Sequence, residues 1–157
     1  MPYPNQQRNQ GGTPQGARQF QPRQNSKWTE LQATEEIHRQ LGQDYVNSIL
    51  SVRKDDYNTY IDKVKKYMQE NARNISTSQI RNIFSRIRSI QNYHELALLR
   101  PKLAYISGRE ERNDAMKTML YLLDRLMVAV DSEEKLRQFQ DFFEAVVAYH
   151  KYWGGKN

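Results

Sequence analysis

The sequence contains no cysteine and no long apolar run. Without cysteine the chain can form neither a disulfide bond nor a thiolate metal site, a composition that fits a reducing cytoplasm. No apolar run approaches the ~20 residues that a membrane-spanning helix needs, and the first residues lack the apolar core of a secretion signal. We therefore expect a cytoplasmic protein with no membrane association.

Groups that carry catalysis are scarce as well. The three histidines show no pair at the i, i+4 spacing of a helical metal site, and there is neither a glycine-rich phosphate loop nor a Gly-x-Ser-x-Gly turn. Glu35 and His38 have the Glu-x-x-His spacing of di-iron bundles, but such a site needs two of these units and two further carboxylates. A metal-dependent enzyme built on Glu35 and His38 is therefore disfavoured, and we expect no enzyme activity, no cofactor and no metal ion.

The first 26 residues differ in composition from the rest of the chain. They are rich in Gln, Asn, Gly and Pro, and they contain three arginines and no acidic residue. Such a segment cannot bury enough apolar surface to offset the entropy that ordering would cost. We predict a disordered basic arm over residues 1–26 and one folded domain over residues 27–157. Two roles are open for the arm, namely non-specific contact with RNA and a merely solubilising leader.

The folded part has the periodicity of helices. Apolar residues recur at three- and four-residue spacing, and no segment shows the alternation of a β-strand. The pattern predicts an all-α fold, a compact bundle of five or six helices. Gly42 and Gly108 are predicted to follow helix ends, and Pro101 either kinks a helix or lies in its first turn. The two longest helices are predicted over residues 110–130 and 133–153.

The clearest helix start lies at Ser76. Its hydroxyl is suited to accept a backbone N–H of the first turn, and Gln79 is suited to return a hydrogen bond to the Ser76 N–H in a capping box. Apolar residues at helical spacing follow, from Ile80 to Ile90. The charge of this region is one-sided, because residues 71–94 contain four arginines and no acidic residue.

Five basic residues form the candidate site. Arg81 and Arg88 are seven residues apart, which is two helical turns, so they project from the same edge of the apolar stripe. Lys102 and Arg109 have the same spacing, and Lys151 lies near the end of the last predicted helix. Arginine can bind phosphate through two parallel hydrogen bonds, and the net charge of +6 favours a polyanionic partner. The pattern therefore favours contact with a nucleic-acid backbone.

Each of these residues also has an ordinary structural explanation. The helix that carries the paired arginines can be a solvated amphipathic helix without a ligand. Arg109 can form an ion pair with Glu110 or Asp114, and Lys151 can complement the dipole at the C-terminal end of its helix. The sequence alone does not choose between these explanations and a phosphate-binding role.

Three sequence motifs follow one another in order. They are Ser-Thr-Ser-Gln-Ile-Arg-Asn over residues 76–82, Leu-Arg-Pro-Lys-Leu-Ala-Tyr over 99–105 with Gly-Arg-Glu at 108–110, and Phe-Phe-Glu-Ala-Val-Val-Ala-Tyr-His-Lys-Tyr over 142–152 before Gly-Gly-Lys. Together they resemble the small subunit of type III-A CRISPR–Cas effector complexes, the Csm small-subunit family. The resemblance covers about residue 75 to the C-terminus. The segments before residue 71 match no motif of the family.

The resemblance implies a function in antiviral defence. It implies a non-catalytic helical subunit that stacks with copies of itself in a short filament, beside the backbone and large subunits of the ribonucleoprotein. The filament lines the channel that holds the guide RNA and the target RNA, while cleavage belongs to other subunits. By analogy, the RNA-binding residues within the matching motifs are Arg81, Lys102, Arg109 and Lys151, with Arg88 on the same face as Arg81. Because base pairing with the guide reads the sequence, such a subunit needs only charge and shape to hold the RNA.

A second hypothesis stays open. The protein can instead be a helical protein-interaction adaptor whose basic faces meet acidic partners and never contact RNA. Tyrosines at exposed positions, such as Tyr121 and Tyr152, suit protein interfaces. The two hypotheses differ in whether the partners stay bound after RNase treatment.

Overall fold

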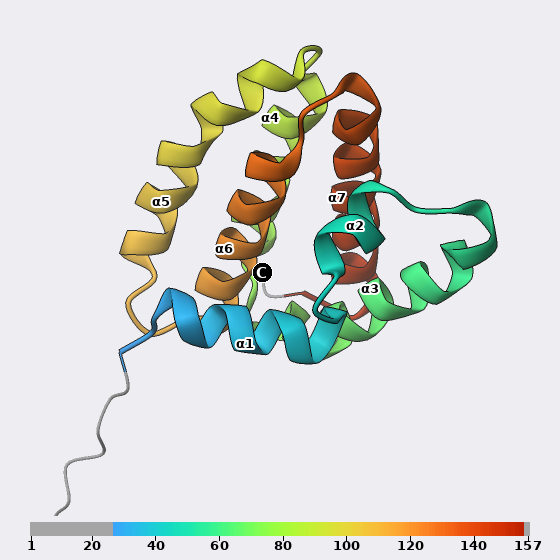
Figure 1. Ribbon diagram of the computed structural model, residues 1–157. Coiled ribbons are helices and arrows are strands. Elements are labelled where there is room, and N and C mark those ends of the chain that lie inside the picture. Colours follow the sequence, from blue (N-terminus) through green and yellow to red (C-terminus); the bar gives the residue numbers. More distant parts are fainter. Residues whose placement is uncertain (1–26, 156–157) are drawn as a thin grey trace, which may run out of the picture.

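The computed structural model describes residues 27–155, which form seven α-helices and three short 3-10 helices (Figure 1). The all-α prediction is therefore confirmed, with seven α-helices in place of the predicted five or six because residues 45–50 form a short helix of their own. The predicted arm over residues 1–26 lies outside the described residues. The α-helices are α1 (Glu30–Leu41), α2 (Tyr45–Leu50), α3 (Tyr57–Asn71), α4 (Thr77–Ser89), α5 (Arg100–Arg109), α6 (Asp114–Ala129) and α7 (Glu133–Tyr152). The 3-10 helices are η1 (Lys54–Asp56), η2 (Ala72–Asn74) and η3 (Tyr93–Leu99).

The core forms around α6 and α7. In Figure 1, the axes of α5, α6 and α7 are roughly aligned, the chain runs in alternating directions from one to the next, and α1 crosses the lower end of this bundle. α6 packs against α1, α2 and α5, while α7 packs against α2, α3 and α4. Both central helices bury a complete apolar stripe, which includes Leu126 on α6 and Phe139 and Phe143 on α7. α4 and α5 therefore lie at the outside of the bundle, each with one face on a central helix.

Most of the predicted helix signals have the expected geometry. Gly42 follows α1 with a φ of 91°, a conformation that favours glycine, and Pro101 lies in the first turn of α5. The Ser76 hydroxyl accepts the backbone N–H of Gln79 at 3.4 Å, as predicted for the start of α4. The return bond of the predicted capping box is absent, because the buried Gln79 side-chain oxygen has no hydrogen-bond partner within residues 27–155.

Two predicted helix limits were wrong. Gly108 lies inside α5 rather than after it, and the helix ends one residue later, at Arg109. The helix predicted to begin at residue 110 begins at Asp114, because the Asn113 side chain accepts the backbone N–H of Met116 and so caps α6. The other polar end of Asn113 donates to the Asn74 carbonyl at 2.6 Å, which joins the start of α6 to the segment before α4.

Two side chains of α7 hold both ends of α4. Gln140 donates its amide to the carbonyls of Ile87 and Ile90 at 3.1 and 3.0 Å, at the C-terminal end of α4. At the other end, the buried His150 ring contacts the Ile75 carbonyl at 2.8 Å through Nε2. α4 and α7 are therefore antiparallel, and the outer face of α4 is fixed in orientation relative to the core.

Replacement of Gln140 with alanine is expected to destabilise the fold by about 1–2 kcal/mol, because two partly buried carbonyls would no longer have a hydrogen-bond donor. Urea denaturation followed by circular dichroism would measure the change in the free energy of unfolding. Gln138→Ala is the matched control, since Gln138 lies on the same helix and makes no hydrogen bond that links α7 to α4. An equal effect of the two variants would show that Gln140 does not hold the end of α4.

Candidate functional site

The exposed side of α4 carries the first pair of candidate residues. Arg81 and Arg88 are exposed, and no ion pair formed within residues 27–155 involves either of them. The Arg88 guanidinium lies over the Phe84 ring, 6.0 Å from its centroid, and the Phe84 ring packs against Phe143 of α7 at 5.8 Å. The apolar stripe predicted from Ile80 to Ile90 faces the core, so Arg81 and Arg88 point away from the core and toward solvent.

α5 presents the second pair. Lys102 is half-buried and Arg109 is exposed at the end of the helix. The alternative explanation for Arg109, an ion pair with Glu110 or Asp114, is not what the structure shows. The Arg109 guanidinium instead lies over the ring of Tyr105, 5.8 Å from the ring centroid.

The two helices repeat one arrangement of side chains that was not predicted from the sequence. In α4 the order is Arg81, Phe84 and Arg88, and in α5 it is Lys102, Tyr105 and Arg109, so each aromatic ring has a cation three residues before it and an arginine four residues after it. We call these residues the α4 strip and the α5 strip. The identical spacing is readable in the sequence, but only the structure shows that each arginine lies over its ring.

The two strips run in opposite directions along the bundle. Asn113, which follows α5, donates to the carbonyl of Asn74, which precedes α4, so the end of α5 lies near the start of α4. Arg109 therefore lies toward the same end of the bundle as the start of α4, while Lys102 lies toward the end that carries Arg88. α4 packs on α7 and α5 packs on α6, so the two strips are held by different central helices.

Lys151 lies at the same end of the bundle as the start of α4. The neighbouring His150 contacts the Ile75 carbonyl, while Lys151 itself is exposed and forms no ion pair with any residue from 27 to 155. After it the chain turns sharply, because Gly154 has a φ of 69° and the Gly155 N–H donates to the His150 carbonyl at 2.9 Å. A dipole role for Lys151 at this helix end stays consistent with its position.

The region that carries both strips has little acid. Residues 71–109 contain seven lysines and arginines and one acidic residue, Glu95. One of the seven is neutralised from outside the region, because the Arg100 Nε lies 2.7 Å from the Asp124 Oδ1 of α6. Asp124 also accepts a hydrogen bond from Arg125, with 2.9 Å between the Arg125 Nη2 and the Asp124 Oδ2. Burial raises the pKa of the Asp124 carboxyl, but the hydrogen bonds from these two arginines outweigh burial and hold that pKa below its usual value. Arg100 is therefore not free for a ligand.

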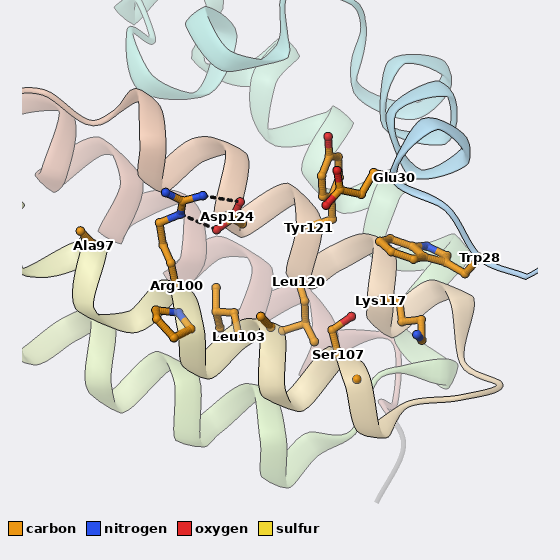
Figure 2. A pocket seen from close by; sticks show the side chains of 13 residues that line it. Trp28, Glu30, Ala97, Arg100, Leu103, Ser107, Lys117, Leu120, Tyr121 and Asp124 are labelled. Carbon is orange, nitrogen blue, oxygen red and sulfur yellow. Dashed lines mark hydrogen bonds and ion pairs between the residues drawn. The ribbon is translucent and has the colours of Figure 1, made fainter.

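A pocket of about 600 Å³ lies beside this ion pair, between α5, α6 and the start of α1. Figure 2 shows Arg100 and Asp124 at one end, Trp28 and Lys117 at the other, and Leu103 and Leu120 between them. The indole N–H of Trp28 donates to Thr118 of α6 at 3.2 Å, which holds the start of α1 against the pocket. None of the five predicted RNA-binding residues lines it.

Glu35 and His38, the residues of the disfavoured metal site, are not joined by other described side chains that could bind a metal ion with them. Glu35 is exposed, and the half-buried His38 ring packs 5.9 Å from the Tyr45 ring. Over residues 27–155, no three His, Asp or Glu side chains come together in a group that could hold a metal ion. None of the helices in the described part of the chain is long and apolar enough to cross a membrane.

Comparison with known proteins supports the resemblance. Residues 54–156 match the model of the family described as Csm2 Type III-A. A curated relative from Streptococcus thermophilus, named "CRISPR system Cms protein Csm2", is 29% identical over 114 residues, which cover 62% of this chain and 93% of that protein. No solved structure shows a significant match. The family match extends over more than half of the chain and contains all five candidate residues, so this protein belongs to the Csm2 family and is a small subunit of a type III-A CRISPR effector complex.

Proposed function

We propose that this subunit binds RNA through the α4 strip, the α5 strip and Lys151, and that it does so without catalysing a reaction. The observation that carries the proposal is that none of Arg81, Arg88, Lys102, Arg109 and Lys151 forms an ion pair with any residue from 27 to 155. Cations that the fold leaves unneutralised in an acid-poor region are suited to the phosphates of a guide–target duplex.

The contacts are expected to be independent of RNA sequence. An A-form duplex presents phosphates and 2′-hydroxyls, while its deep major groove is closed to side chains. Arginine and lysine on rigid helices can hold that backbone, and pairing between guide and target supplies the sequence information. α4 is rigidly placed because α7 holds both of its ends through Gln140 and His150.

Protein–protein contacts complete the proposal. We propose that the other effector subunits, and neighbouring copies of this subunit in a short filament, contact surfaces of the protein away from the strips. Leu98 on η3 and Leu31 on α1 are exposed by 77% and 69%, and we propose that these side chains contribute to such contacts. An adaptor that never touches RNA would need only such surfaces.

The double variant Arg81→Ala, Arg88→Ala is expected to bind single-stranded RNA about 20-fold more weakly than the wild type at about 0.1 M salt, because two phosphate-binding groups are removed. The slope of log affinity against log salt should become shallower by about 1.4. Filter binding or fluorescence anisotropy over a salt series measures both quantities, and circular dichroism confirms that helical content is kept.

Lys63→Ala, Lys66→Ala is the matched control, since both lysines are exposed on α3 and the change in charge is the same. It should leave the affinity within about twofold of the wild type. If the two double variants lose affinity equally, binding follows net charge and the interface is wrongly located. If the wild type binds no RNA and still captures effector subunits after RNase treatment, the adaptor hypothesis is correct.

A further inference from the structure

One exposed aromatic ring is unexplained by packing. Five rings in the described part of the chain have a cation over them, and those of Trp28, Phe84, Tyr121 and Tyr152 also contact another aromatic ring. Tyr105 is the exception within residues 27–155, because it makes no ring–ring contact and is 67% exposed. Its neighbours Leu103 and Ile106 turn toward the core, so Tyr105 is not needed to attach α5.

The surroundings of the ring suit an anionic ligand. Lys102 and Arg109 lie one turn before and one turn after Tyr105, and α5 contains no acidic residue. Gly108 is three residues after Tyr105 on the same helix, and a Cβ added there would meet no atom within 4 Å. Glycine inside a helix is destabilising relative to alanine, and packing does not require it at this position. The open space at Gly108, one turn after the exposed ring, leaves room for a flat ligand to approach this face of α5.

We infer that Tyr105 is a stacking site for an unpaired nucleobase, with Lys102 and Arg109 on the phosphates that flank it. The inference rests on the proposed function and adds a base contact to what is otherwise a phosphate-binding surface. Aromatic stacking is tolerant of sequence because every base has a π face, so the site needs no hydrogen-bond readout. The base must be unpaired, since a base within the duplex has both faces covered by its neighbours.

The α4 strip does not offer the same site. Its ring, Phe84, is half-buried and packs against Phe143, so the ring belongs to the core and the two arginines act alone. Tyr152 is nearly as exposed as Tyr105, but Tyr149 and Trp153 contact its ring edge-on, whereas no other aromatic ring within residues 27–155 contacts Tyr105. The difference between the two strips makes the assignment specific to α5.

The test compares Tyr105→Leu with Tyr105→Phe in the full-length protein. The probes are a single-stranded RNA and the same RNA with abasic sugars throughout, which keeps the phosphates and removes the bases. Tyr105→Leu is expected to weaken binding of the normal RNA by about 5- to 20-fold with no change in salt slope, because no charge is removed. Tyr105→Phe should stay within about twofold of the wild type, and neither variant should change binding of the abasic RNA. RNA carrying 5-iodouridine should cross-link to the peptide that contains residue 105 in the wild type and in Tyr105→Phe, but not in Tyr105→Leu.

The outcomes separate this inference from the proposed function. Tyr57→Leu, at another exposed tyrosine, is the control for a general loss of aromatic surface. If Tyr105→Leu binds both RNAs like the wild type, the stacking site is wrong while the phosphate-binding function stands. If it no longer captures another effector subunit and keeps its RNA affinity, Tyr105 belongs to a protein interface and the inference is overturned. If the wild type binds no RNA at low salt, both the proposed function and this inference fail.

Discussion

Replacing all five candidate cations with glutamine is expected to weaken RNA binding by about three orders of magnitude at about 0.1 M salt. Each cation that no longer binds a phosphate removes a favourable release of counterions, worth roughly a factor of five per cation on single-stranded RNA at this salt concentration. The fold should be kept, because these side chains lie outside the core and form no ion pair within residues 27–155. The measurement is an anisotropy titration over a salt series, with the replaced residues being Arg81, Arg88, Lys102, Arg109 and Lys151.

A second five-residue variant separates location from net charge. Each variant lowers the net charge from +6 by five, to +1, so long-range attraction to RNA is reduced equally. The control should lose far less affinity than the first variant, because its cations lie on other surfaces of the molecule. Equal losses would mean that the protein binds RNA as a uniformly charged body and that the strips have no special role. The control residues, all exposed and unpaired within residues 27–155, are Arg53, Lys54, Lys63, Lys66 and Arg137.

Phe143→Ala is expected to reduce the free energy of unfolding by about 3–5 kcal/mol. The Phe143 side chain is completely buried in the middle of α7, and its ring contacts Phe84 of α4. Truncation removes the transfer free energy of the ring and leaves a cavity between these helices, which the surrounding helices can fill only in part. A loss of this size is a large fraction of the stability of a small domain.

Equilibrium unfolding in urea measures the effect, and an unchanged m value would show that the variant changes stability and not the surface exposed on unfolding. Phe143→Leu is the control, because it keeps most of the apolar volume, and it should cost less than half as much. Since Phe143 lies beneath the α4 strip, Phe143→Ala should also weaken RNA binding more than Phe143→Leu. A loss of stability below about 1 kcal/mol for Phe143→Ala would show that α4 is not held by this contact.

The helical elements were predictable because their signals are local. The N-terminal cap at Ser76, the C-terminal glycine at Gly42 and the apolar stripe of α4 all depend on residues within a few positions of one another. Two predictions that rested on local signals were wrong. Glycine is common just after the end of a helix, but α5 continues through Gly108 for one more residue. Gln79 completes the spacing of a capping box, but its side-chain oxygen is buried away from the Ser76 N–H.

Part of the candidate site was also local. Seven residues make two turns of a helix, so the sequence alone put Arg81 with Arg88 and Lys102 with Arg109 on shared faces. The order of the three motifs was enough to indicate the family, which the match over residues 54–156 then established. None of this required knowledge of which helix packs against which.

What only the tertiary structure decided is which charges and rings are free. Arg100 has the same local surroundings as Lys102, yet it is neutralised by Asp124, which is 24 residues away in the chain and belongs to the neighbouring helix. Phe84 and Tyr105 occupy equivalent positions in two matching strips, yet one is packed against Phe143 and the other is exposed. Helical periodicity fixes the direction of a side chain relative to its own helix, because it depends on backbone geometry alone. The presence of a carboxylate or another ring in that direction depends on contacts between distant segments, and these form only when the helices pack.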